Sequence, residues 1–67
     1  MKRDKLIAYR GSRTQAEMGT LYKVTYQAWG QWESGVKTPT VDKMKRLELD
    51  SGIPMEELFP DVFCNLK

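Results

Sequence analysis

Hydrophobic positions along the 67-residue chain recur three or four residues apart, as they do on one face of an α-helix. No segment alternates between apolar and polar residues in the manner of a half-buried strand. Glycine, proline and threonine residues divide the pattern into five short segments, without repeats, low-complexity stretches or a Gly/Ser linker. The pattern therefore predicts one all-α domain of five short helices.

The first two predicted helices carry clear boundary signals. The first extends to about Arg10, and Gly11 is placed to end it in a left-handed conformation. The second begins after Thr14, which forms with Glu17 the pattern of a capping box, where each side chain bonds a backbone N–H of the first turn. The residues predicted to be buried are Leu6, Ile7 and Tyr9 in the first helix and Met18, Leu21 and Tyr22 in the second.

Residues 15–34 fit the plan of a helix-turn-helix, in which a turn of three or four residues joins two short helices. Gly19 lies where the two helices must approach closely. Thr25 caps the second of them, and Gly35 closes it. The positions predicted to face inward are Met18, Tyr22, Val24, Trp29 and Trp32, and those predicted to face outward are Tyr26, Gln27, Gly30 and Gln31.

The outward positions carry no charge, whereas Lys and Glu dominate an ordinary surface helix. A glutamine offers a donor and an acceptor side by side, which match N6 and N7 of adenine in the DNA major groove. Gln27 and Gln31 therefore favour base recognition. The alternative is two surface amides without a function.

Proline and threonine also mark the fourth and fifth predicted helices. Pro39 blocks continuation of the preceding segment, Thr40 caps the fourth helix, and Gly52 ends it. Pro54 suits the first turn of a short fifth helix. Their predicted core residues are Val41, Met44 and Leu47, followed by Leu58 and Phe59.

Composition argues against an enzyme. A chain of this length buries only about 60% of its unfolded surface, too little for both a core and a sizeable ligand pocket. Without His and with a single Cys, it lacks a His base, the usual zinc ligands and an intrachain disulfide. We expect no catalysis, cofactor, metal or small-molecule ligand. Without a signal peptide or a long apolar run, we expect a cytoplasmic protein with no membrane contact.

The net charge of +2 is unevenly distributed. Five basic residues against one acidic residue make residues 1–13 net +4, whereas four against six make residues 41–67 net −2. Such asymmetry fits a polyanionic partner, or simply solvated surfaces.

Several stretches of the chain resemble the Cro/CI-type (XRE) helix-turn-helix family of phage and bacterial repressors. They are TQAE at residues 14–17, VT at 24–25, WESGVKTPT at 32–40 and GIPMEELF at 52–59. The resemblance covers about residues 5–59, without internal gaps after Thr14. It implies a lambda-repressor-like five-helix domain over residues 1–59, followed by an apolar tail at 60–67.

The resemblance implies roles for individual residues. The recognition helix spans about residues 25–33, and Gln15 contacts a phosphate and braces this helix. Arg10 and Glu33 form a structural ion pair. Loss of one partner costs roughly 3 to 5 kcal/mol if the pair is buried, whereas an exposed pair contributes about 0 to 1 kcal/mol. The implied base-reading residues are Thr25, Tyr26, Gln27, Gly30 and Gln31, and the implied phosphate contacts are Arg13, Gln15, Lys37 and Thr38.

Some of these positions keep an alternative. Tyr26 could equally pack against a phosphate, and Lys37 could simply be solvated. Lys23 occupies a turn position where the family usually has glycine, and a left-handed conformation there costs on the order of 1 kcal/mol. Gly30 removes a side chain from a base-facing position and could allow close approach of the backbone to DNA.

The resulting hypothesis is sequence-specific binding of double-stranded DNA and regulation of transcription, by default repression. We expect a homodimer on a pseudo-palindromic operator. The alternative is a protein-interaction module, such as an antitoxin or antirepressor, that acts on a partner protein through the apolar tail. Val62, Phe63 and Leu66 in that tail predict packing on the domain or on a second chain. Cys64 is expected to be an inert thiol, with a redox switch as the alternative.

Overall fold

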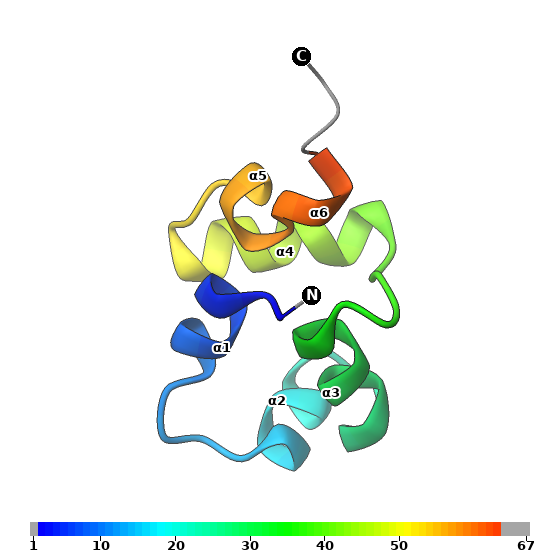
Figure 1. Ribbon diagram of the computed structural model, residues 1–67. Helices are drawn as coiled ribbons and strands as arrows, with labels where there is room; N and C mark the ends of the chain where they lie inside the picture. Colours follow the sequence, from blue (N-terminus) through cyan, green and yellow to red (C-terminus); the bar gives the residue numbers. More distant parts are fainter. Residues whose placement is uncertain (1, 64–67) are drawn as a thin grey trace.

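The computed structural model describes residues 2–63 and, within that range, contains helices and no strands (Figure 1). The all-α class is therefore confirmed, but six helices replace the predicted five. The additional helix lies in the predicted tail, where Pro60 occupies the first helical position. The helices are α1 (Asp4–Arg10), α2 (Gln15–Leu21), α3 (Tyr26–Ser34), α4 (Val41–Ser51), α5 (Met55–Leu58) and α6 (Pro60–Phe63).

Three of these helices begin at the predicted threonine caps. Each threonine hydroxyl accepts a hydrogen bond from the backbone N–H three residues further on, which the first helical turn leaves without an intrahelical partner. The capping box at α2 is complete, because the Thr14 N–H donates to Glu17 Oε1 at 2.8 Å. These bonds, first the one from the backbone of Thr14, lower the pKa of Glu17. The cap distances are 3.0 Å for Thr14 and Glu17, 3.1 Å for Thr25 and Ala28, and 3.4 Å for Thr40 and Lys43.

The predicted helix ends are confirmed in part. Gly35 and Gly52 end α3 and α4 in the left-handed conformation. Gly11 does not, because its φ of 61° is combined with a ψ of −131°, an extended conformation open to glycine. Gly11 still ends α1 as predicted, because its N–H donates to the Ile7 carbonyl at 3.2 Å. Lys23 has a φ of 59°, so it adopts the left-handed conformation that glycine would favour at this turn position.

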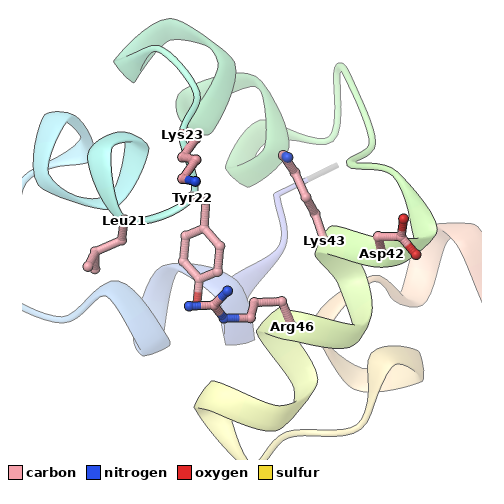
Figure 2. A pocket seen from close by; sticks show the side chains of 6 residues that line it. All are labelled: Leu21, Tyr22, Lys23, Asp42, Lys43 and Arg46. Atoms are coloured by element: carbon pink, nitrogen blue, oxygen red, sulfur yellow. The ribbon is translucent and has the colours of Figure 1, made fainter.

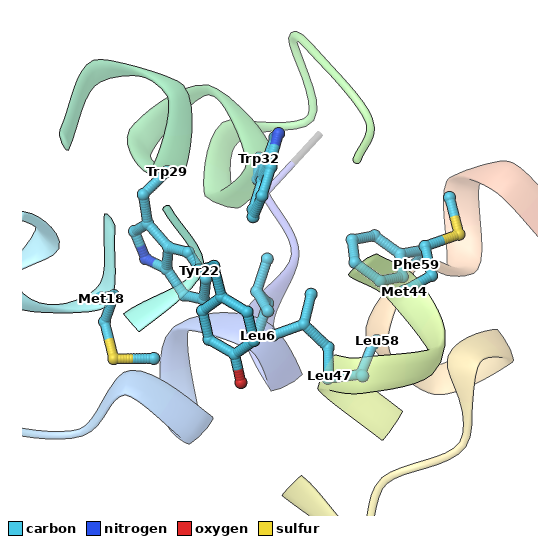
Figure 3. Packing of buried hydrophobic residues seen from close by; sticks show 9 residues of the cluster. All are labelled: Leu6, Met18, Tyr22, Trp29, Trp32, Met44, Leu47, Leu58 and Phe59. Carbon is cyan, nitrogen blue, oxygen red and sulfur yellow. The ribbon is translucent and has the colours of Figure 1, made fainter. Parts of the chain in front are cut away.

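The core contains the two tryptophans and the side chains that surround them (Figure 3). The Trp29 ring stacks on Tyr22 with 5.6 Å between centroids and meets Trp32 at 5.5 Å. Most predicted core positions are buried, and Ile7, Tyr9 and Val24 are half-buried. The buried hydrophobic residues are Leu6, Met18, Tyr22, Trp29, Trp32, Met44, Leu47, Leu58 and Phe59.

Two predicted core residues are on the surface. Leu21 is 53% exposed and Val41 is 62% exposed. Leu21 is the last residue of α2 and Val41 is the first of α4, and fewer neighbouring elements cover a side chain at a helix end. Helical spacing identified the side of each helix that faces the core. It did not indicate which residues on that side lie beyond the neighbouring helices and are therefore exposed.

A chain of hydroxyl groups joins α1, the end of α2 and α4. The Tyr22 hydroxyl donates to Asp50 Oδ2 at 2.9 Å and lies 2.9 Å from the Tyr9 hydroxyl. Since Tyr22 donates its one proton to Asp50, Tyr9 donates to Tyr22. Burial, followed by these two bonds, raises the pKa of Tyr22 well above its ordinary value. The buried phenol is therefore neutral and fully hydrogen-bonded.

The predicted tail packs on the domain only in part, because Val62 is 39% exposed. Phe63 is half-buried against the core, and Asp61 forms an ion pair with Arg3. Cys64 and Leu66, for which we predicted an inert thiol and a packing role, lie outside the described residues. None of the helices within residues 2–63 has the length and apolar character required to cross a membrane.

Candidate nucleic-acid interface

The two helices of the predicted motif, α2 and α3, meet closely at Gly19. A Cβ atom at this position would lie 2.6 Å from the Val24 carbonyl oxygen and 3.1 Å from backbone atoms of Thr25. The Val24 N–H donates to the Gly19 carbonyl at 2.8 Å, so the turn closes directly on α2. The predicted close approach is confirmed, and it fixes the start of α3 against α2.

The two sides of α3 differ in the way the sequence predicts. Trp29, Trp32 and Glu33 are buried on the inner side. On the outer side Tyr26 is 56% exposed, Gln27 is exposed, and Gln31 is half-buried. The outer side of α3 thus offers an exposed phenol, an exposed amide and a half-buried amide, and its opposite side is anchored in the core.

The Glu33 carboxylate holds α3 to two other elements. Its Oε2 accepts from Arg10 Nε and from Trp29 Nε1, both at 2.6 Å, and its Oε1 accepts from Gln15 Nε2 at 3.0 Å. The predicted Arg10–Glu33 ion pair is therefore present, with side chains 24% and 5% exposed. The bond from Trp29 was not predicted, and Gln15 was predicted to brace the helix but without Glu33 as its partner. All three neighbours donate, and an ionised carboxylate only accepts, so the residue type fits its surroundings.

Gln15 and Gly30 lie against each other, which sequence reasoning missed. A Cβ atom at Gly30 would be 3.3 Å from Gln15 Oε1 and 3.4 Å from Nε2. The missing side chain of Gly30 thus gives the Gln15 amide the room to reach Glu33. The bracing of α3 by Gln15 is confirmed, while its contact with a phosphate and the approach of Gly30 to DNA remain predictions.

Arg13, a predicted phosphate contact, is bound to the end of α1. Its guanidinium donates to the Tyr9 carbonyl at 2.8 Å and to the Arg10 carbonyl at 3.2 Å, and it lies 5.2 Å from the Tyr9 ring centroid. These bonds satisfy carbonyls that the end of a helix leaves unpaired. The structure therefore gives Arg13 an intramolecular role for which the sequence held no signal.

The largest omission from the sequence-based site is Arg3, which is buried completely. The segment ahead of α1 lies between α3 and α6 (Figure 1), where the Arg3 N–H donates to the Glu33 carbonyl at 2.8 Å. Its guanidinium lies 4.9 Å from the Phe59 ring centroid and donates five hydrogen bonds. The acceptors are Asp61 Oδ1 at 2.9 Å, Asp61 Oδ2 at 2.8 Å, the Trp32 and Lys37 carbonyls at 2.8 Å each, and Thr38 Oγ1 at 3.0 Å.

The carboxylate of Asp61 balances the charge of this buried arginine. The Arg3 hydrogen bonds lower the pKa of Asp61, so the group stays ionised beside it. The pair joins residues 58 positions apart, a separation at which no sequence pattern links them. Lys37 and Thr38, the predicted phosphate contacts that Arg3 holds, are both exposed.

A groove of about 440 Å³ lies beside the turn between α2 and α3 (Figure 2). It is partly basic, although Arg46 is paired with Asp50 at 3.2 Å. Its lining includes none of the predicted DNA contacts. The residues around it are Leu21, Tyr22, Lys23, Asp42, Lys43 and Arg46.

Among the predicted base-reading residues, Thr25 is exposed as the N-cap of α3, whereas Gly30 and Gln31 are half-buried within the helix. The other predicted site residues fall into three groups. Gln27 and Tyr26 are exposed on α3, and Lys37 and Thr38 are exposed on the loop that follows it. Gln15, Arg10 and Glu33 form the bonded network behind α3, and Arg13 is attached to α1. Comparisons of the chain with protein-family models, curated proteins and solved structures found no match.

Proposed function

We propose that this protein binds double-stranded DNA in a sequence-specific manner and regulates transcription, with α2 and α3 as the helix-turn-helix of a lambda-repressor-like, Cro/CI-type domain. The observation that carries the proposal is the asymmetry of α3. Its inner side is fixed by Trp29, Trp32 and the Glu33 network, and its outer side presents uncharged hydrogen-bonding groups. A rigid helix with amides on its free side is suited to reading base edges.

In this arrangement α3 enters the major groove and the flanking residues hold the DNA backbone. Gln27 and Gln31 pair with base edges, preferably adenine, and Tyr26 contacts a base or a phosphate. Lys37 neutralises a phosphate irrespective of sequence. A homodimer on a pseudo-palindromic operator places two such helices in successive major grooves. Repression is the simplest outcome, because it requires only occupation of a promoter.

The first test is the salt dependence of duplex binding. We expect the affinity to fall steeply between about 50 and about 200 mM salt, with a log-log slope of about −0.9 for each phosphate that the protein neutralises. Fluorescence anisotropy with duplexes from a random-sequence library and with duplexes selected from it measures both the slope and the preference. Absence of binding at the lowest salt concentration contradicts the proposal.

A second test separates base reading from backbone contact. Gln27→Ala and Gln31→Ala should each weaken binding to the selected duplex by about 1 to 3 kcal/mol and leave binding to scrambled DNA nearly unchanged. Lys37→Ala should weaken both duplexes equally and reduce the salt slope by about one. Lys45→Ala, which removes the same charge from the exposed surface of α4, is the matched control and should have the smaller effect.

Circular dichroism of each variant verifies that the fold is intact. If both glutamine variants retain the full preference for the selected duplex, α3 does not read bases. The module that acts through a partner protein is then the favoured function.

A further inference from the structure

We propose that Arg3, held by Asp61 of α6, is a positioning residue for DNA binding. It sets the loop of Lys37 and Thr38 against the end of α3 and presents the Thr38 hydroxyl as a hydrogen-bond donor to a phosphate. This inference rests on the proposed function. It adds Arg3 and Asp61 to the residues that support DNA binding. Both lie outside the predicted helix-turn-helix, and Asp61 belongs to the segment that was expected to be a tail.

The guanidinium of Arg3 connects the end of α3 directly to the loop after it. A single nitrogen, Nη1, donates to the carbonyl of Trp32 in α3 and to the carbonyl of Lys37, both at 2.8 Å. The N–H groups of Val36 and Lys37 also donate to the Gln31 carbonyl, at 3.0 and 3.2 Å. The backbone at Lys37 is therefore tied to the helix that carries Gln27 and Gln31, which fixes the distance between the two predicted kinds of DNA contact.

The bond to Thr38 fixes the direction of a proton as well as a position. A guanidinium has no acceptor, so Thr38 Oγ1 must accept from Arg3 Nη2 at 3.0 Å. The one hydroxyl proton of Thr38 then points away from Arg3. Because Thr38 is exposed, this proton is available to an acceptor outside the protein. A phosphate oxygen is such an acceptor, and hydroxyl groups are common donors to the DNA backbone.

Asp61 orients the guanidinium by a two-point contact. Its two carboxylate oxygens accept from Nε at 2.9 Å and from Nη2 at 2.8 Å, so the pair fixes the guanidinium plane. Nη2 bonds both Asp61 and Thr38, and any rotation of the plane therefore moves the donor to Thr38. Residue 61 in α6 thus controls the loop through Arg3. An untethered loop would have to be ordered on binding, which lowers affinity.

The decisive variant is Asp61→Asn, which has the same shape but no charge. We expect it to weaken binding to selected and scrambled duplexes alike by about tenfold, as for the loss of one charge-assisted bond to phosphate. The change raises the net charge by one, which alone would strengthen binding to DNA, so the expected effect has the opposite sign to the electrostatic one. The preference for the selected duplex should be unchanged.

Glu57→Gln is the matched control. It removes the carboxylate of another ion pair with the N-terminal region, Lys5–Glu57, whose side chains are exposed and do not touch the loop. The change in net charge is the same as in Asp61→Asn. We expect its affinity for DNA to equal or slightly exceed that of the unaltered chain. A tenfold loss in this variant as well would overturn the assignment to Arg3 and Asp61.

A double-variant comparison distinguishes positioning from a general loss of stability. In a chain that already carries Lys37→Ala and Thr38→Val, Asp61→Asn should change affinity by less than about twofold, because the groups that it positions are gone. Binding is measured well below each melting midpoint. If Asp61→Asn does not fold, Asp61→Glu is used instead, because it keeps the charge but displaces it. We expect the same tenfold loss of affinity in the otherwise unaltered chain, and a change of less than about twofold in the chain with Lys37→Ala and Thr38→Val.

The outcomes separate this inference from the proposed function. If the unaltered chain binds no duplex, both are wrong. If the unaltered chain binds and Asp61→Asn binds equally well, or if its loss persists at full size without Lys37 and Thr38, only the positioning role is wrong. Amide hydrogen exchange gives a readout without DNA, because the N–H of Lys37 should lose protection in Asp61→Asn and retain it in Glu57→Gln.

Discussion

Replacement of Glu33 by alanine is expected to lower the free energy of unfolding by about 3 to 5 kcal/mol, which is a large part of the stability of a domain this small. The carboxylate is buried and accepts hydrogen bonds from Arg10, Trp29 and Gln15. Its removal leaves the buried indole N–H without an acceptor and the arginine without its counter-charge. Urea denaturation followed by circular dichroism measures the difference.

Two further variants test the reason for this loss. Glu33→Gln keeps the size and one carbonyl oxygen, and the Gln15 amide can turn its own oxygen toward the new NH₂ group, so the loss should be smaller, about 1 to 2 kcal/mol. Glu57→Ala removes an exposed carboxylate with an ion-pair partner and should cost only about 0 to 1 kcal/mol. Equal losses for Glu33→Ala and Glu57→Ala would show that burial of the Glu33 network contributes nothing.

Gly19→Ala is expected to lower the free energy of unfolding by about 2 kcal/mol, although alanine is the better helix former. The new Cβ would lie 2.6 Å from the Val24 carbonyl oxygen, well inside van der Waals contact. That atom belongs to the backbone of the turn and cannot rotate away, so overpacking costs about 3 kcal/mol. The higher helix propensity of alanine relative to glycine offsets about 1 kcal/mol of this cost. Thermal and urea unfolding of the variant measure the net loss.

Gly30→Ala is the matched control, because it makes the same change in the next helix. Here the nearest atoms belong to the flexible Gln15 side chain, at 3.3 Å or more. The side chain can shift, so we expect the gain of about 1 kcal/mol in helix propensity to offset most of the loss of its contact with Glu33. If Gly19→Ala is no less stable than Gly30→Ala, α2 and the turn do not meet as closely as the structure has them.

Local features of this fold could be predicted from the sequence, because the signals that define them act over three or four residues. The caps at Thr14, Thr25 and Thr40 depend on a hydroxyl and the nearest free N–H groups. The inward and outward sides of α3 follow from the helical repeat, which placed Trp29 in the core and Gln27 on the surface. The predicted number of helices was wrong only in the last segment, which contains α6. A helix of four residues is not stable by itself, so the formation of α6 depends on its packing against the domain.

The candidate site could be predicted only in part for the same reason. Gln27 and Gln31 belong to one helix and could be found from its periodicity, although Gln31 is half-buried. The supporting groups come from distant parts of the chain, as with Gln15 beside Gly30 and Arg3 beside Asp61. In the sequence Arg3 is one of several basic residues near the N-terminus, and nothing indicates that it is buried.

The sequence by itself thus determined where α2, α3 and α4 begin and which side of each helix is apolar. Only the tertiary structure decided which helix ends stay uncovered, as at Leu21 and Val41, and which charges are enclosed, as at Arg3 and Glu33. The physical reason is the separation along the sequence over which each kind of interaction acts. Capping and periodicity depend on neighbours within one turn, whereas burial of a charge depends on acceptors that folding brings from up to 58 residues away.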